Sequence, residues 1–212
     1  MSIYLLSDTY HKGVINLPQI KVTCRDINLD LSSYNALIFS SKNGVKAISK
    51  INTNWKNILS YAIGIPTANL IKKEGGQVKY IANSSYGDDF AKELIPLLKE
   101  KKVLFIRAKT VLSDLEDILK NAGIDLTSQV VYETTCKEKT DDKIEENSVF
   151  IFTSPSTVKC FFKNHKWQNS YKAVCIGDVT AKSFPFDISL HVSKIQTIPG
   201  CIELAKTLIK QN

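Results

Sequence analysis

The sequence predicts an α/β protein made of two similar domains, each built around a parallel sheet with helices on both faces. Two observations lead to this prediction. Short apolar strands alternate with amphipathic helices along the 212 residues, and two separate segments recur at one constant shift of 113 residues. Parallel neighbours in a sheet require crossover connections, and the intervening helices supply them.

The internal repeat is carried by two pairs of matching segments. Phe39, Ser41, Val45 and Lys46 recur as Phe152, Ser154, Val158 and Lys159, and Ile63, Gly64, Thr67 and Ala68 recur as Ile176, Gly177, Thr180 and Ala181. Each half thus has an apolar strand that ends in a hydroxyl-rich turn, then a helix. A glycine follows the serine by 23 residues and closes a second strand, and Thr-Ala opens another helix. This βαβα order is typical of Rossmann-like and flavodoxin-like domains, whose ligands bind at the carboxyl ends of the strands.

Further elements complete both halves. We expect a strand near residues 78–81, a helix over 88–100, a strand over 103–107 and a helix over 112–122 in the first half. The second half continues with a strand near 188–193 and a helix over 201–210, and it then lacks a last strand. The N-terminal apolar segment 3–7 resembles that missing strand.

The chain is therefore expected to start in one domain, build the other as an insertion, and return. Residues 1–18 and 137–212 form the first domain in this interpretation, and residues 29–126 form the inserted one. Segments 19–28 and 127–136 cross between them as hinge strands with a cleft alongside. Both segments are rich in β-branched residues, which favours a paired ribbon over a loose linker.

Composition limits the classes of function. The formal net charge of +7 favours an anionic partner, which the charge alone leaves open among nucleic acid, an acidic surface and a polycarboxylate ligand. No apolar run is long enough to span a membrane, and no basic stripe interleaved with aromatic residues indicates nucleic-acid binding. The five cysteines include no CxxC pair and the histidines show no zinc-ligand spacing, so we expect reduced thiols, no metal and a cytoplasmic location. Cys136 and Cys160 are expected to be buried thiols.

The repeated hydroxyl residues are the leading candidates for a binding site. Ser41 and Ser154 follow strands and enter helices, where a hydroxyl either caps the helix or, with free backbone amides, binds an anion. Gly64 and Gly177 are expected to let the backbone turn tightly before Thr67 and Thr180. A nucleotide-binding loop is not supported, because neither segment matches GxGxxG or GxxxxGKS.

Tyr132 lies on the second crossing segment. Strand alternation points its side chain away from Val131 and Glu133, so the phenol either faces a cleft as a proton donor or packs against a domain edge. Periodicity alone favours packing.

Taken together, the FTSPSTV turn at residues 152–158, the IGDVTA turn at 176–181 and the VYET segment at 131–134 resemble the uroporphyrinogen-III synthase family. The resemblance covers nearly the full length. It implies a cofactor-free cytoplasmic enzyme of tetrapyrrole synthesis that cyclises hydroxymethylbilane with inversion of the last pyrrole ring and loss of water. That substrate carries eight carboxylates, which suits a basic protein with anion-binding turns.

The resemblance also implies roles for individual residues. Ser41, Thr67, Ser154 and Thr180 match the family's substrate-contacting hydroxyls, Lys172 its cleft lysine and Tyr132 its crossing tyrosine, the candidate proton donor. The segment after Arg107 departs from the family pattern, because Ala108 stands where many relatives have glycine and no second arginine follows.

The alternative function is a hinge-closing binding module for a small anionic ligand, which would share the duplication and the cleft. The expected partner is in either case a small molecule, with no nucleic acid or membrane, and the chain is expected to be a monomer.

Overall fold

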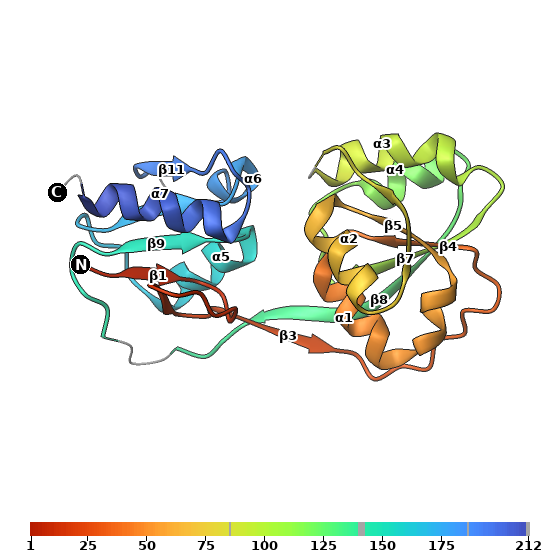
Figure 1. Ribbon diagram of the computed structural model, residues 1–212, viewed down its shortest axis with the longest axis horizontal. Helices are drawn as coiled ribbons and strands as arrows, with labels where there is room; N and C mark the ends of the chain where they lie inside the picture. The colour runs from red at the N-terminus through yellow and green to blue at the C-terminus, as the bar shows by residue number, and fades with distance from the viewer. Residues whose placement is uncertain (85, 140–142, 186, 211–212) are drawn as a thin grey trace. The chain divides into compact units, whose positions relative to one another are not determined.

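A computed structural model describes residues 1–84, 86–139, 143–185 and 187–210. The chain divides into two compact units, one made of Met1–Lys21 and Thr135–Asn212 and the other of Val22–Thr134 (Figure 1). Each unit contains one sheet.

The second unit is built on a six-stranded sheet in the order β3-β8-β7-β4-β5-β6. Its strands are β3 (Ile20–Cys24), β4 (Ala36–Phe39), β5 (Leu59–Ala62), β6 (Gln77–Ile81), β7 (Lys102–Ala108) and β8 (Asp125–Cys136). Its helices are α1 (Lys42–Ile51), the 3-10 helix η1 (Thr53–Asn57), α2 (Gly64–Lys73), α3 (Gly87–Leu98) and α4 (Leu115–Asn121). β4 is central and pairs in parallel with β5 and β7.

Strand alternation explains why helices cover both faces of this sheet. Leu37 and Phe39 of β4 pack into the core cluster that includes α1, α2 and Trp55. Ala36 and Ile38 point to the other face, where the cluster includes residues of α3 and α4. A strand buried on both faces reads as a continuous apolar run, as β4 does.

The first unit has a five-stranded sheet in the order β11-β10-β9-β1-β2. Its strands are β1 (Ile3–Leu5), β2 (Ile15–Asn16), β9 (Val149–Phe152), β10 (Lys172–Cys175) and β11 (Leu190–Val192), and its helices are α5 (Pro155–Asn164), α6 (Asp178–Ala181) and α7 (Ile198–Lys210). The pairings between these strands are parallel. Phe150 and Phe152 face the cluster that contains α5, whereas Val149 and Ile151 face α7.

These sheets confirm the predicted α/β class with parallel neighbours and helices on both faces. β1 pairs with β9, so the N-terminal strand lies in the sheet of the C-terminal half. The predicted ribbon also forms: β3 and β8 are neighbours, with the Arg25 amide donating to the Val131 carbonyl at 2.8 Å and the Lys137 amide to the Gln19 carbonyl at 2.9 Å. These two pairings run in opposite sequence directions, so the ribbon is antiparallel.

Several elements differ from the sequence prediction, among them α7, which begins at Ile198, three residues earlier than expected, and η1, which was not expected. Helix α4 begins at Leu115, three residues later than expected, because the preceding segment is tied down by the Asp114 amide, which donates to the Asp88 carboxylate at 2.8 Å. The short strand β2 was not expected, and it pairs with β1 as the edge strand of the sheet. Among the described residues, we find no helix with the length and apolarity that crossing a membrane requires.

Candidate active site

The two repeated serines cap helices at equivalent places in the two sheets. Ser41 follows β4 and accepts a hydrogen bond from the Asn43 amide at 3.1 Å. Ser154 follows β9 and accepts from the Thr157 amide at 3.3 Å, while the Thr157 hydroxyl accepts from the Ser154 amide at 3.2 Å. The capping interpretation is therefore confirmed for both serines. Each cap also fixes a partly exposed hydroxyl at the carboxyl end of the central strand and at the positive end of a helix ten residues long.

Each sheet brings a threonine beside its serine turn. Thr67 lies in α2, which follows β5, and Thr180 lies in α6, which follows β10. β5 is the parallel neighbour of β4, and β10 is the parallel neighbour of β9. Since the carboxyl ends of parallel strands meet at one edge of a sheet, each unit by itself gathers a serine and a threonine there. Both threonines are buried.

The glycines before these threonines make different turns despite the matching sequence. Gly64 has a φ of +72°, a left-handed conformation that favours glycine, so the prediction of a tight turn is confirmed there. Gly177 has a φ of −175°, which is extended backbone open to any residue, and it serves as the N-cap of α6. The same prediction was wrong for Gly177.

Tyr132 lies at the same edge as Ser41. Its strand β8 pairs with β7, and the Tyr132 carbonyl accepts from the Lys109 amide at 2.9 Å, just past the end of β7. The ring is buried in the core cluster that includes residues of α1, and the Ser41 side chain lies near enough to its phenol to influence it. Burial raises the pKa of Tyr132, and the nearby Ser41 side chain opposes part of that rise. The packing interpretation is therefore confirmed for the ring, and the role of the phenol as a proton donor stays a prediction.

Lys172 is not brought to this edge. It is the first residue of β10, whereas Thr180 follows the last, and four strand residues span about 10 Å. Its ammonium group donates to the Leu208 carbonyl in the last turn of α7 at 3.0 Å. The family's cleft-lysine role for Lys172 stays a prediction, and in this structure the residue stands at the amino end of β10.

Arg107 engages a carboxylate of the protein itself. Its guanidinium donates to Glu116 at 3.0 Å, and Lys120 bonds to the same carboxylate at 2.7 Å. Burial of Glu116 acts to raise its pKa, but hydrogen bonds and these two cations outweigh burial and lower it.

The loop after β1 was missed as part of this edge. β1 is the other parallel neighbour of β9, so the loop that follows it emerges beside the Ser154 turn. The Asn16 amide group holds it there, donating to the carbonyls of Ser7 at 2.7 Å and Thr9 at 2.9 Å. The signal was available, because the N-terminal strand was already expected in this sheet.

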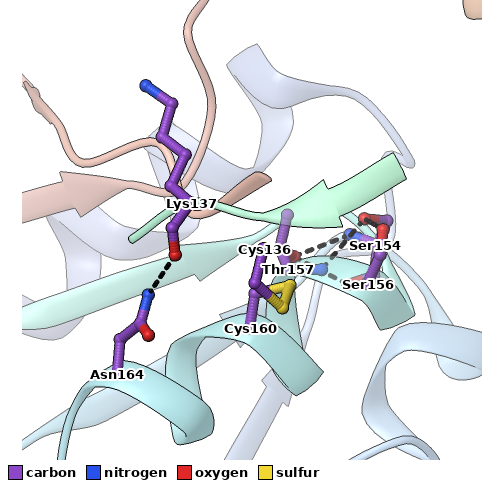
Figure 2. Close-up of a disulfide and its surroundings, with 7 residues drawn as sticks. All are labelled: Cys136, Lys137, Ser154, Ser156, Thr157, Cys160 and Asn164. Atoms are coloured by element: carbon purple, nitrogen blue, oxygen red, sulfur yellow. Dashed lines mark hydrogen bonds between the residues drawn. A yellow bond between two sulfur atoms is a disulfide. The ribbon is translucent and has the colours of Figure 1, made fainter. Parts of the chain in front are cut away.

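A disulfide joins the end of β8 to α5. Cys136 and Cys160 are bonded with their Cα atoms 5.1 Å apart, and Figure 2 shows the bond beside the cap formed by Ser154 and Thr157. The Asn164 amide group adds a hydrogen bond to the Lys137 carbonyl at 3.0 Å. The expectation of two buried thiols was wrong, because a spacing of 24 residues gives no sign that a crossing strand ends over a helix. In the described ranges, no three His, Cys, Asp or Glu side chains are grouped so that they could hold a metal ion.

Comparison with known proteins adds the decisive observation. A family model described as uroporphyrinogen-III synthase HemD matches residues 13–203, which include both serine turns, both threonines and Tyr132. This chain belongs to the uroporphyrinogen-III synthase family.

Individual relatives agree with this assignment. A candidate uroporphyrinogen-III synthase of Methanocaldococcus jannaschii is 28% identical over 204 residues, with 87% of this chain and 83% of that protein covered. The crystal structure of uroporphyrinogen-III synthetase from Helicobacter pylori 26695 is similar with a TM-score of 0.81 and 29% identity, covering 98% of this chain and 99% of that one. A mutant uroporphyrinogen-III synthase of the extremely thermophilic bacterium Thermus thermophilus shares the fold, with a TM-score of 0.60 at 13% identity and 99% of both chains covered.

The family assignment decides between the two functions that the sequence left open. The chain is a uroporphyrinogen-III synthase, a cyclising lyase of tetrapyrrole and haem biosynthesis, and not a binding module.

Proposed function

We propose that this uroporphyrinogen-III synthase holds the carboxylates of hydroxymethylbilane at the carboxyl edges of its two sheets. The contacts are assigned to Ser41 and Thr67 on one sheet and to Ser154 and Thr180 on the other. The observation that carries the proposal is the recurrence of a capped serine turn, beside a helix bearing a threonine, in both units. A polyanion with eight carboxylates suits such turns and a protein of net charge +7.

The residues at these edges favour anion binding for an electrostatic reason. The first amides of a helix have no partner within the helix, and its aligned peptide dipoles place positive charge at that end. α1 has no acidic residue in its first turn, and neither does α5. A carboxylate there meets no repulsion from the helix itself.

Tyr132 is proposed to donate a proton during departure of the hydroxyl group. Its strand β8 pairs with β7, which in turn pairs with β4, so the phenol and the Ser41 turn belong to the same sheet edge. The raised pKa keeps the phenol protonated through the neutral range, which keeps the donor available but makes it a weak acid. A weak acid suffices where the pyrrole nitrogen itself helps to expel the leaving group.

The reaction then proceeds in balanced steps. The C–O bond of the hydroxymethyl group breaks, the oxygen takes the donated proton and leaves as water, and the first ring becomes an azafulvene. The substituted α-carbon of the last ring attacks this electrophile to give a spiro intermediate. One bond of the spiro centre breaks and a new bond forms at the other α-position, which reverses the ring, and loss of a proton restores the pyrrole and the phenol.

Positioning is the larger part of the proposed catalysis. Without the enzyme, the linear tetrapyrrole closes at the unsubstituted α-carbon of its last ring and gives the unreversed type I isomer. The enzyme is proposed to hold the carboxylates of the substrate so that its first ring meets the substituted carbon of its last ring. This restriction of the substrate's conformation precedes bond formation and favours the type III isomer.

Replacement of Thr180 by Val tests the carboxylate contacts. A charge-assisted hydrogen bond contributes roughly 1.5 to 3 kcal/mol, so kcat/KM for type III product should fall about 10-fold to 150-fold. Thr207 is the matched control, because it is exposed on α7 and its hydroxyl donates to the Leu204 carbonyl within the same helix. Thr207→Val should keep wild-type kinetics. If kcat/KM is equal in the two variants, Thr180 does not contact the substrate.

We also propose that the enzyme acts as a cytoplasmic monomer with no nucleic-acid or membrane partner and no resident cofactor. Its location follows from the family's place in tetrapyrrole synthesis. The monomer is supported by the helices that cover both faces of each sheet. Light scattering should give a mass near 23.7 kDa, and a mass twice as large would contradict the monomer.

A further inference from the structure

Some of the large apolar side chains that remain exposed follow the carboxyl ends of strands in both sheets. In the described part of the chain, the exposed large apolar residues that follow the carboxyl end of a strand are Tyr10, Ile65, Tyr86, Leu112, Val179 and Ile195; those located elsewhere are Met1, Ile15, Val22, Leu97 and Val192. Single exposed apolar residues are ordinary on a protein surface. What needs an explanation is their arrangement around the serine turns.

In the second unit, the Ser41 turn is flanked on both sides. It follows β4, whose neighbours are β7 and β5. Leu112, in the segment after β7, is 75% exposed, and Ile65, in the first turn of α2 after β5, is 64% exposed. The capping hydroxyl thus follows a strand whose two neighbours are each followed by an exposed aliphatic side chain.

The first unit repeats this arrangement with other residues. The Ser154 turn follows β9, whose neighbours are β10 and β1. Val179, in α6 after β10, is 43% exposed, and Tyr10, in the loop after β1, is 79% exposed. Tyr10 is kept near this edge because the neighbouring Thr9 carbonyl accepts from Asn16 at the end of β2.

The arrangement matches the chemistry of one kind of ligand. A hydroxyl and helix amides suit a carboxylate, and a flanking aliphatic or aromatic side chain suits the face of a ring. A linear tetrapyrrole carries its carboxylates on short side chains of pyrrole rings, so each ring presents both features within a few ångströms. A free inorganic anion or a simple dicarboxylate would leave the apolar side chains uncovered.

We propose that Leu112, Ile65, Val179 and Tyr10 form ring-contact sites for the pyrrole rings of the substrate, flanking the two serine turns. This inference rests on the proposed binding of hydroxymethylbilane at these edges and adds which residues recognise its rings. Each pair is argued from its own sheet.

Four serine variants, Leu112→Ser, Ile65→Ser, Val179→Ser and Tyr10→Ser, test the proposal. Burial of a large apolar side chain against a ring predicts a rise in KM of about 5-fold to 10-fold for each variant, with kcat within 2-fold of wild type. Leu97→Ser is the matched control, because Leu97 is 38% exposed in the last turn of α3. This turn precedes the start of β7 and does not follow the carboxyl end of a strand. The conservative variants Leu112→Met and Tyr10→Phe keep an apolar side chain at each position, so they should have the KM of wild type.

A second measurement separates ring contact from turnover. Uroporphyrin III, the stable oxidised form of the product, carries pyrrole rings and carboxylates, and its binding can be titrated by fluorescence. The four serine variants should bind it about 5-fold more weakly than wild type or Leu97→Ser. Unchanged KM and unchanged titration in all four variants, or an equal loss in Leu97→Ser, would overturn the proposal. A wild-type protein that yields no type III product would contradict the proposed function, whereas ring contact would still be decided by the titration.

Discussion

A buried phenol beside a capping serine links the packing of the protein to its proposed chemistry. Tyr132 fills part of the core, and its phenol lies near Ser41, which itself caps α1. Removal of either hydroxyl therefore changes the surroundings of the other. Such neighbours are expected to show non-additive effects.

Tyr132→Phe removes the hydroxyl and keeps the ring. We expect turnover to fall about 10-fold to 1000-fold while the remaining product stays mainly type III, because the substrate is still held in its productive fold. Because the ring keeps its packing, the free energy of unfolding should change little. A type I product would assign ring positioning to Tyr132, and full activity would make it a packing residue.

Ser41→Ala and the double variant complete a mutant cycle. Ser41→Ala should cost about 1 kcal/mol of stability through its lost cap as well as activity. Because the two hydroxyls are neighbours, the combined loss of kcat should be smaller than the sum of the single losses in free energy. Strict additivity in the kinetic cycle would show that the pair does not act together.

Lys172→Met tests the position of that side chain in the structure. Its ammonium group bonds to the end of α7, at the opposite edge from Thr180, so kcat/KM should stay within about 2-fold of wild type. A rise in KM comparable to that of Thr180→Val would contradict this assignment. Thermal unfolding of the variant reports the loss of the contact with α7.

At the scale of elements, alternation and repetition predicted most of the architecture. The apolar runs that became β4 and β9 are buried on both faces, and the repeated serines follow them as predicted. What the sequence did not indicate depended on three-dimensional details that residue type does not encode. Gly177 repeats Gly64 in sequence but not in conformation, and Lys172 precedes its turn in sequence but lies at the other end of the strand.

The disulfide was beyond prediction for a related reason. A strand that crosses between units can end over any of several helices, and only the assembled chain shows that Cys136 lies over Cys160. The ring-contact residues were equally invisible, since exposure is a property of the folded chain. The sequence indicated that these residues follow strands, but it did not indicate which of them would be exposed.

Reduction of the disulfide should loosen the link between β8 and α5. A cross-link that closes 24 residues contributes about 3 kcal/mol by restricting the unfolded chain. Cys136→Ser should lose about that much unfolding free energy without reductant, and wild type should lose the same amount with dithiothreitol. Cys24→Ser, at an unpaired cysteine, is the control.

Thiol counting checks the same bond directly. Denatured but unreduced protein should show the three free thiols of Cys24, Cys175 and Cys201, and reduction should reveal the other two. Five reactive thiols in protein prepared under air would contradict the disulfide.

At the scale of the whole molecule, buried thiols should weaken the fold at alkaline pH. Burial raises the pKa of Cys175 from 9.0 to about 12, with a further contribution from Cys201. Above pH 9 the unfolded thiol loses its proton and the folded one keeps it, so the unfolded state binds fewer protons and stability falls as pH rises towards 12. The slope is about 1.4 kcal/mol per pH unit for each such thiol.

Urea unfolding at pH 8 and pH 10.5 measures this effect. Cys175→Ala should lose about 2 kcal/mol less than wild type between the two pH values, because the variant lacks that titration. An equal loss of unfolding free energy in both proteins would show that titration of Cys175 does not cause the fall in stability at alkaline pH.

The central claim is that this chain directs cyclisation of hydroxymethylbilane to the reversed isomer by holding its carboxylates at two hydroxyl edges. The most direct measurement supplies enzymatically generated hydroxymethylbilane, oxidises the products and separates the type I and type III uroporphyrins. We expect mainly type III with wild-type protein and type I alone in its absence. Type I at the uncatalysed rate with folded wild-type protein would contradict it.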